Sequence, residues 1–287
     1  MSSIREYWSM TEGAFNCLYD TKRTMAFKRA IKVAVRPGDV VVDAGSGTGI
    51  LAMFAADAGA KKVYAIELDD NNLKVLQGIF AANGYGDRIE VIHGDATTLT
   101  LPERADVIVC EMIATALIEE LQVPVMNNML RFVNPDYRVV LEKYECHAEL
   151  VRQKNLYHGK RFDIIRYEYP EKPSLRAKIL SNRVTYKRVY FAKRTADQTV
   201  SAHLGFLIEQ DGVINGLRLS ATTKFHGGEE FQSSFSYSYP IVLPIDEVAV
   251  KTGDTVVVDL SYQLCGGLGG LDYEIASINP GGGGGKF

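Results

Sequence analysis

Residues 39 to 141 alternate between short apolar runs typical of strands and longer stretches with the spacing of helices. The strand-like runs are DVVVDAG, KKVYAIEL, RIEVIHGD, ADVIVCE and YRVVLE, and the helical stretches are ILAMFAADAGA, NNLKVLQGIFAANG and ALIEELQVPVMNNMLRFVN. Strands separated by helices need crossover connections, which make the strands parallel. VVVD and VIVC lack alternation, as expected when helices cover both faces of the sheet. The pattern predicts a doubly wound, Rossmann-like α/β unit.

The chain changes character after about residue 142, where its segments become rich in Val, Tyr, Thr and Phe. These segments are RVTYKRVYFAK, TVSAHLGFLIE, LRLSATTKF, FSYSYPIVL and DTVVVDLSYQL. Gly, Asn or Asp separates many of them and no long helical period appears, so we expect an antiparallel β-barrel or sandwich. No Gly/Ser linker marks the junction, so the two parts are expected to pack together. Residues 10 to 34 have a helical pattern and are expected to cap a ligand.

The composition is that of a soluble globular protein, with 287 residues, 46% hydrophobic residues and a formal net charge of −3. That charge gives no overall attraction to nucleic acid or anionic membrane. The four cysteines lack metal-ligand spacing, which favours reduced thiols in a cytosolic protein. The first residues form no apolar signal region, and no run of about 18 apolar residues occurs. We therefore expect a cytoplasmic protein without a membrane partner or a metal site.

The strongest local signal is VVVDAGSGTGILAMFAA, in which Asp43 ends a strand and three glycines turn the chain into a helix. Glycines are needed where a strand turns tightly and its backbone approaches a ligand. An acidic residue before the loop would repel a phosphate but could hold an ammonium group. The next strands end in Glu67, suited to two ribose hydroxyls, and in Gly94-Asp95-Ala96, where a carboxylate could receive an adenine amino group. Amine, ribose and adenine together indicate S-adenosylmethionine.

The stretch VVVDAGSGTGILAMFAADAGAKKVYAIE resembles the class I S-adenosylmethionine-dependent methyltransferases and, among them, the protein arginine methyltransferases. Upstream, YDTKRTMAFKRAI resembles that family's cofactor-covering helix, and Arg23 falls where the family places an arginine against the methionine carboxylate of the cofactor. An Arg fork suits that contact. With the resemblance included, the expected cofactor contacts are Arg23, Asp43, Gly45, Ser46, Gly47, Gly49, Glu67, Leu68, Gly94, Asp95, Ala96 and Glu111.

The segment CEMIATALIEE follows the fourth strand, where an open α/β sheet binds its ligands. Arginine methyltransferases carry two glutamates nine residues apart here, and Glu111 and Glu120 have that spacing. In one continuous helix these side chains would lie on opposite faces. Convergence therefore requires a loop between them, with the helix starting near Ala116 or Leu117 and with Glu119 facing solvent. The resemblance implies that Glu111 and Glu120 are catalytic: two carboxylates would bind a guanidinium and aim one nitrogen at the methyl group.

The sequence departs from the family in three places. The family's trp-met-gly-tyr after the first glutamate is replaced by Met112-Ile113-Ala114-Thr115, and its thr-his-trp loop by Phe235-Ser236-Tyr237, which lacks the histidine. The region from 151 to 200 is shorter than the family's and shows no clear dimerisation arm. The resemblance therefore supports the cofactor more strongly than it supports arginine as the acceptor.

Four parts are expected along the chain. Residues 1–36 form an N-terminal helical cap, 37–142 the S-adenosylmethionine-binding Rossmann-like domain, 143–279 a β-barrel-like substrate domain and 280–287 a flexible Gly-rich tail.

The favoured function is methyl transfer to a protein side chain, arginine or another nitrogen such as that of histidine, and a homodimer is compatible with the family. An alternative is an RNA or tRNA methyltransferase, because residues 150 to 195 hold 13 Lys/Arg against 3 Asp/Glu with tyrosines between them. The fourth strand, however, lacks the asn-pro-pro-tyr type of loop used to methylate base amino groups. A small-molecule acceptor stays open. A scaffold without activity is disfavoured by the intact set of cofactor residues.

Overall fold

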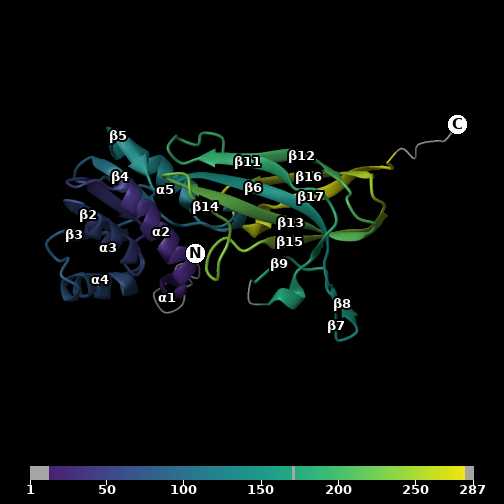
Figure 1. The fold of residues 1–287 in the computed structure, drawn as a ribbon, viewed down its shortest axis with the longest axis horizontal. Coiled ribbons are helices and arrows are strands. Elements are labelled where there is room, and N and C mark those ends of the chain that lie inside the picture. The colour runs from purple at the N-terminus through teal and green to yellow at the C-terminus, as the bar shows by residue number, and fades with distance from the viewer. Residues whose placement is uncertain (1–12, 170–171, 282–287) are drawn as a thin grey trace.

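A computed structural model describes residues 13–169 and 172–281 of the chain. Figure 1 shows an elongated molecule with the parallel sheet and its helices at one end and long antiparallel strands at the other. The α-helices in the described ranges are α1 (Gly13–Tyr19), α2 (Thr21–Ala34), α3 (Ile50–Asp57), α4 (Asp70–Ala82) and α5 (Gln122–Met129). The start of the predicted cap, residues 1–12, and most of the predicted tail lie outside the described residues. Within the described ranges, no helix has both the length and the apolar character that a membrane span requires.

The parallel sheet has the strand order β3-β2-β1-β4-β5. Its strands are β1 (Val40–Ala44), β2 (Lys62–Glu67), β3 (Ile89–His93), β4 (Ala105–Cys110) and β5 (Val133–Val139). The order reverses direction between β1 and β4, and ligands bind beyond the carboxyl ends of strands at such a point. Ala44 pairs with both Ile66 and Cys110, so β1, β2 and β4 end at the same edge. The predicted doubly wound α/β fold is confirmed.

Two predicted elements have different bounds in the structure. YRVVLE is not one strand, because β5 ends at Val139 and β6 (Leu141–Arg152) begins two residues later. The long helix expected near Ala116 or Leu117 is wrong: α5 begins only at Gln122, flanked by the short 3-10 turns η1 (Thr115–Leu117) and η2 (Leu130–Phe132). Pro124 explains the later start, because proline fits the first turn of a helix, where its missing N–H has no intrahelical partner, but disrupts the interior.

The rest of the described chain is antiparallel, as predicted. The main sheet runs β10-β6-β13-β15-β9, with β11 also on β6 and β14 on β13, and a separate sheet runs β12-β16-β17. A closed barrel stays a prediction. The bounds are β7 (Leu156–Tyr157), β8 (Lys160–Arg161), β9 (Arg166–Tyr167), β10 (Lys178–Ile179), β11 (Val184–Tyr190), β12 (Thr199–Leu207), β13 (Gly212–Phe225), β14 (Glu230–Phe231), β15 (Ile241–Val250), β16 (Thr255–Gln263) and β17 (Asp272–Asn279), with the 3-10 turns η3 (Pro173–Leu175) and η4 (Leu268–Gly270).

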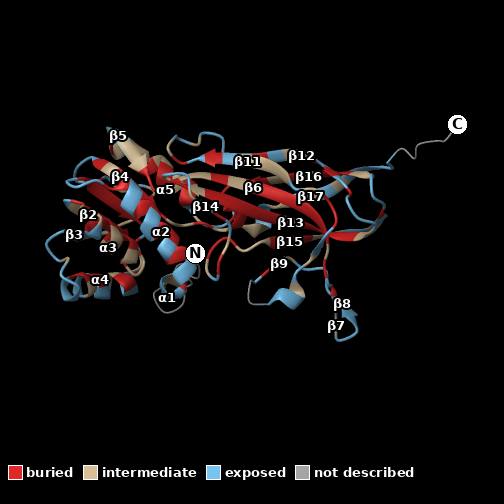
Figure 2. Ribbon diagram, viewed as in Figure 1, coloured by how far each residue is buried: buried red, intermediate tan, exposed pale blue. Residues whose placement is uncertain are grey.

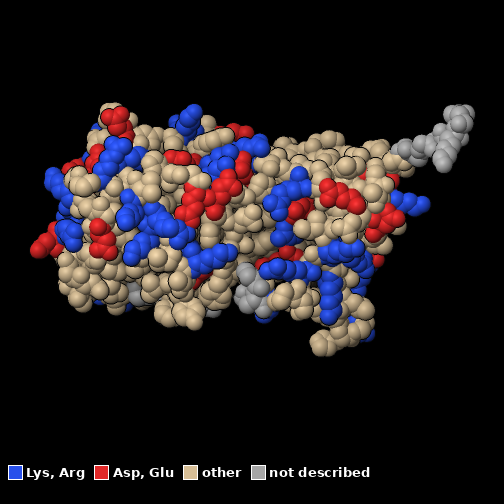
Figure 3. Space-filling model, viewed as in Figure 1, with Lys and Arg blue, Asp and Glu red and all other residues tan. Residues whose placement is uncertain are grey.

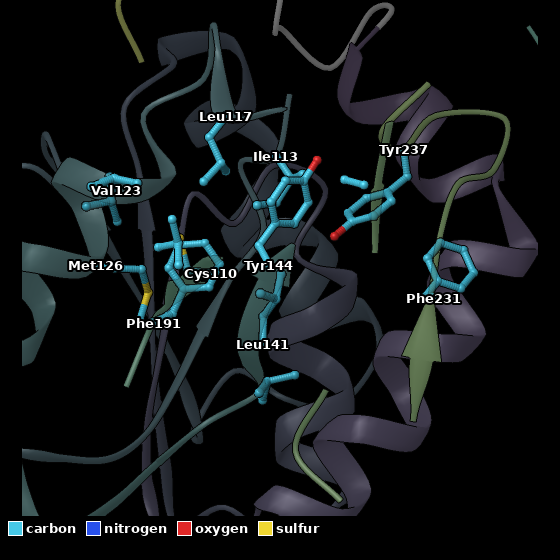
Figure 4. Close-up of a cluster of buried hydrophobic side chains, with 14 of the residues drawn as sticks. Cys110, Ile113, Leu117, Val123, Met126, Leu141, Tyr144, Phe191, Phe231 and Tyr237 are labelled. Carbon is cyan, nitrogen blue, oxygen red and sulfur yellow. The ribbon is translucent and has the colours of Figure 1, made fainter. Parts of the chain in front are cut away.

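One hydrophobic core runs through both parts of the molecule, as the lack of a linker predicted. Figure 2 shows buried residues continuing from the parallel strands into β6 and β13. At the junction, Ile113 and Leu117 from the segment after β4 share a cluster with Tyr144 of β6 and with Tyr237 (Figure 4). The segment that carries the predicted catalytic glutamates is therefore packed between the two parts.

Candidate active site

The glycine-rich turn after β1 adopts a left-handed backbone at all three glycines. The φ angles of Gly45, Gly47 and Gly49 are 82°, 54° and 79°, a region that side chains with a Cβ atom enter at a cost. Gly45 and Ser46 donate their N–H groups to Ile66 O, at 3.0 and 2.9 Å, which ties the turn to the end of β2. The turn then leads directly into α3.

Asp43 is 1% exposed and lies at the end of β1, directly before this turn. Burial raises the pKa of its carboxyl to about 7, the Ser46 hydroxyl at 2.9 Å opposes the rise, and the nearby Glu67 charge adds to it. A carboxyl that is buried beside a second acidic group is stabilised in its charged form by a cation. The ammonium group of S-adenosylmethionine is a cation of this kind, so the site fits that group.

Glu67, at the end of β2, has both carboxylate oxygens held by backbone amides. Oε2 accepts from Gly47 N at 2.7 Å, and Oε1 accepts from Leu68 N and Asp69 N at 2.8 Å each. This fixes the side chain against the glycine turn. Each carboxylate oxygen can accept more than one hydrogen bond, so Glu67 retains capacity for ribose hydroxyls.

The predicted adenine segment follows β3. Gly94 N donates to Glu67 O at 3.0 Å, which brings this segment beside the end of β2. Asp95 is exposed, and its Oδ1 accepts from Thr97 N at 2.8 Å and Thr97 Oγ1 at 2.7 Å. Ala96 is buried, and its carbonyl accepts from Asn128 Nδ2 at 3.0 Å. The three residues therefore lie at the same sheet edge as Glu67.

Arg23 of α2 is 4% exposed and contacts Glu111 rather than solvent. Its Nη2 donates to Glu111 Oε2, and its Nη1 donates to Cys17 O at 3.1 Å. Its Nε is buried and has no hydrogen-bond partner among the described residues. The Arg23 charge partly offsets the rise that burial causes in the pKa values of Asp43 and Glu120. This guanidinium therefore lies between the glycine turn and the segment after β4, with one donor still available for a ligand.

Glu111 and Glu120 lie on either side of a chain reversal. The chain reverses between them at Ala116 and Leu117, which both have a φ of 56°. Burial, and after it the Glu111 charge, raises the pKa of Glu120 well above its ordinary value. Glu119 is exposed, as predicted, and accepts from the Tyr167 hydroxyl. The loop that the nine-residue spacing demanded is therefore present, although the helix after it begins later than expected.

Gln122 was not predicted and holds the backbone on both sides of Glu111. It is 0% exposed, its Nε2 donates to Cys110 O at 3.2 Å, and its Oε1 accepts from Met112 N at 2.8 Å. An amide side chain is suited to this task because it offers a donor and an acceptor at once. The sequence signal is weak: a polar residue at the start of an apolar helix is ordinarily exposed.

The antiparallel part braces the reversed loop from the other side. Tyr262 Oη donates to Ala116 O at 2.9 Å, Cys265 N donates to Leu117 O at 2.7 Å, and Gly267 N donates to Ile118 O at 2.8 Å. These three carbonyls would otherwise lack partners in a buried turn, which is costly. The left-handed residues are therefore held by contacts that are distant in sequence.

The segment before β15 closes the site over α2. Asp20 is the N-cap of α2, and its Oδ2 accepts from Ser234 Oγ at 2.6 Å and from Ser236 N at 2.8 Å. Tyr237 is fully buried and hydrogen-bonds Thr223 at 2.6 Å, and the Glu111 charge, after burial, raises the pKa of its hydroxyl. The segment Phe235-Ser236-Tyr237 therefore lies against the N-terminus of α2, and its place on the acceptor side stays a prediction.

Comparisons with known proteins agree with this geometry. Residues 21–141 match the family model of ribosomal protein L11 methyltransferase (PrmA). An uncharacterized protein of Methanocaldococcus jannaschii is 33% identical over 271 residues, covering 93% of this chain and 96% of the relative. The histone-arginine methyltransferase CARMER of Anopheles gambiae is 33% identical over 144 residues, which cover 50% of this chain but only 23% of that protein. The Trypanosoma brucei PRMT1 enzyme–prozyme heterotetrameric complex with AdoHcy has a TM-score of 0.75 at 20% identity, covering 89% of this chain and 88% of that chain.

The fold and these matches define a class I S-adenosylmethionine-dependent methyltransferase that resembles the protein arginine methyltransferases, and S-adenosylmethionine is its methyl donor. Within that class, the chain belongs to the family of the Methanocaldococcus jannaschii protein, which it matches over nearly its whole length.

Proposed function

We propose that this enzyme methylates a nitrogen of a protein side chain, and that an arginine guanidinium is the acceptor its site fits best. The observation that carries the proposal is the pairing of Arg23 with Glu111 beside Glu120. Glu111 already accommodates one guanidinium, supplied by the chain itself. Planar guanidinium and carboxylate groups match each other in geometry as well as in charge.

The carboxylates would position the acceptor and receive its proton. S-adenosylmethionine supplies an activated methyl group, so the enzyme's main task is to align a nitrogen for in-line displacement. Glu111 and Glu120 would bind the acceptor cation, whose charge would favour ionised Glu120. A carboxyl with a raised pKa, as Glu120 has, is a suitable acceptor for the proton that leaves the methylated nitrogen.

The cofactor would lie along the shared edge of β1, β2 and β3. Asp43 would face the ammonium group, Glu67 the ribose hydroxyls and Asp95 the adenine amino group. Arg23 would turn its free donor to the methionine carboxylate. The remaining predicted contacts, which would supply backbone and shape, are Gly45, Ser46, Gly47, Gly49, Leu68, Gly94, Ala96 and Glu111.

A protein acceptor is favoured over RNA by the relatives and by the surface. The names of the matching family model and of the CARMER relative both specify protein substrates. Six of the 13 basic residues between 150 and 195 form ion pairs with carboxylates, which reduces the charge available to phosphates: Arg152, Arg161, Arg166, Arg183, Lys187 and Arg188. Figure 3 shows acidic atoms interspersed with basic ones over the antiparallel part.

A homodimer remains part of the proposal because the Trypanosoma brucei neighbour is a heterotetrameric complex. The described residues beyond 142 contain no α-helix, only η3 and η4, so no helical dimerisation arm is present there. Sedimentation of the purified chain tests this directly.

The test is methyl transfer by three matched variants, Glu111→Gln, Glu120→Gln and Glu119→Gln. Labelled S-adenosylmethionine is incubated with each enzyme and a native lysate, followed by protease or ribonuclease. We expect protease to release the label. The first two variants should lose about 100-fold or more in turnover, as when one charge-stabilising group is removed, and Glu120→Gln should retain cofactor binding. Glu119→Gln should behave as wild type, because Glu119 faces solvent. Wild-type turnover by Glu111→Gln, or label released by ribonuclease alone, would sink the proposal.

A further inference from the structure

A small pocket lies on the far side of the segment that closes the active site. Its cavity is about 40 Å³, and its walls include Arg183, Arg218, Ser220, Gln232, Ser233 and Ser238. Within residues 232–238, Ser234 and Ser236 contact Asp20 at the active site, whereas Ser233 and Ser238 line the pocket. We call this cavity the arginine–serine pocket.

Two arginines are fixed at the pocket by glutamates that do not line it. Arg218 Nε donates to Glu168 Oε2 at 2.7 Å and its Nη1 donates to Glu149 Oε2 at 2.5 Å, while Arg183 Nε donates to Glu149 Oε1 at 3.0 Å. These bonds use two nitrogens of the Arg218 guanidinium and one nitrogen of the Arg183 guanidinium. Arg218 Nη2 and both Nη atoms of Arg183 have no hydrogen-bond partner among the described residues. Held guanidinium groups with free donors are preorganised for an anion.

The positive charge at the pocket exceeds the negative charge. Glu149 and Glu168 face three arginines, because Arg166 also approaches Glu168, at 3.9 Å. Both Nη atoms of Arg166 are buried without a hydrogen-bond partner among the described residues. The surplus favours a ligand that brings one negative charge.

Ser220 gives independent evidence for a missing ligand. It is 7% exposed on β13, it lines the pocket, and its Oγ has no hydrogen-bond partner within the described chain. Buried hydroxyl groups in folded proteins nearly always have a partner. The hydroxyl can donate to an anion that the arginines also contact.

We propose that the arginine–serine pocket binds an oxyanion, a carboxylate or a phosphate group, through Arg183, Arg218 and Ser220. No carboxylate lines the cavity, so the described walls offer hydrogen-bond donors without an opposing charge. The volume admits a small head group rather than a nucleoside. The site is separate from Glu111 and Glu120 and does not depend on the identity of the methyl acceptor.

The experiment measures anion binding to the full-length protein without cofactor. Sodium phosphate and sodium acetate are titrated by calorimetry and by thermal unfolding, each against sodium chloride at equal ionic strength. A ligand that binds only the folded state raises the unfolding temperature in a saturable manner. We expect such a rise with at least one anion. A rise with phosphate alone identifies a phosphoryl group as the ligand, and a rise with acetate identifies a carboxylate. If neither anion exceeds chloride, the proposal is overturned.

Two variants and a control assign the binding to this pocket. Arg183→Gln and Ser220→Ala should each reduce the affinity for the anion about tenfold, which is the loss expected for one charge-assisted hydrogen bond. Arg188→Gln is the matched control, because Arg188 lies on β11 and pairs with Glu145 of β6 as Arg183 pairs with Glu149. It should bind as wild type does. Unchanged binding by both pocket variants would place the anion elsewhere. Ser220→Ala removes no ion pair, so it reports on the pocket even if Arg183→Gln folds poorly.

Discussion

Asp43 is a buried carboxyl group, so the free energy of unfolding depends on pH. Its pKa is about 7 in the fold and about 3.9 when unfolded. The unfolded chain therefore releases this proton first, so the stabilising contribution is complete below about pH 4 and is lost as the pH rises toward 7. About three pKa units correspond to at most ~4 kcal/mol.

Asp43→Asn should remove this dependence. We expect the cofactor-free variant to have a larger free energy of unfolding in urea than wild type at pH 8. At pH 4 the two values should be similar. Affinity for S-adenosylmethionine should fall by about tenfold or more, because the ammonium group loses its counter-charge. Asp87→Asn, at an exposed carboxylate, is the control and should change neither quantity. Equal pH slopes for Asp43→Asn and wild type would contradict the assignment.

The candidate site residues that lie at or directly after strand ends could be predicted from the sequence. Asp43, Glu67, Asp95 and Glu111 each come directly at or after a strand, and parallel strands bring such positions to one edge. The partner of Arg23 could not be predicted, because Glu111 lies 88 residues away. The sequence pattern shows which residues are charged, but not which of two acidic neighbours a charge will contact.

At the scale of elements, the loop after β4 depends on the helix that follows it. Gln122 is the first residue of α5, so the position of this helix decides whether its amide can reach Cys110 and Met112. The sequence predicted the reversal, since two glutamates nine residues apart cannot converge on one helix. It misplaced the helix start because the apolar spacing of ALIEELQV is also compatible with a helix, and the positive φ at Ala116 is imposed by tertiary contacts.

Gln122→Leu should therefore reduce both stability and turnover. The change leaves Met112 N and Cys110 O without partners in the interior, which costs about 1–3 kcal/mol in the free energy of unfolding. Turnover should fall while the affinity for cofactor changes little, because Glu111 is no longer fixed. Gln122→Glu keeps the acceptor for Met112 N and lets the two bonds be compared. Urea unfolding and steady-state kinetics measure both effects, and unchanged turnover in a folded Gln122→Leu enzyme would show that Gln122 does not position Glu111.

At the scale of the whole molecule, the antiparallel part helps to hold the loop between Glu111 and Glu120. Tyr262 of β16 donates to Ala116 O and hydrogen-bonds Tyr186 of β11 at 3.1 Å. Tyr262→Phe should lower turnover several-fold and cost about 1 kcal/mol of unfolding free energy. Tyr273→Phe, on the neighbouring strand β17, is the control. A wild-type rate for Tyr262→Phe would show that the loop keeps its shape without this brace.

The sequence predicted the antiparallel class of the second part but not its strand pairing. β6 was not recognised as a strand beyond its first residues, because LEKYECHAELVR carries several charges. In the structure these charges pair across strands, as Glu145 does with Arg188 and Glu149 with Arg183. Such pairing depends on register, which local composition does not determine.

Each of the three glycines in the turn after β1 is constrained by a different neighbour. A Cβ at Gly49 would lie 2.5 Å from the Phe80 ring of α4, one at Gly45 would lie 3.1 Å from Met112 Sδ, and one at Gly47 would lie 3.4 Å from Ala14 of α1. Three parts of the molecule, α4, the segment after β4 and α1, therefore contact the same turn of five residues. Gly49 is therefore constrained by packing within the parallel part, whereas Gly45 and Gly47 are constrained by the segment after β4 and by α1.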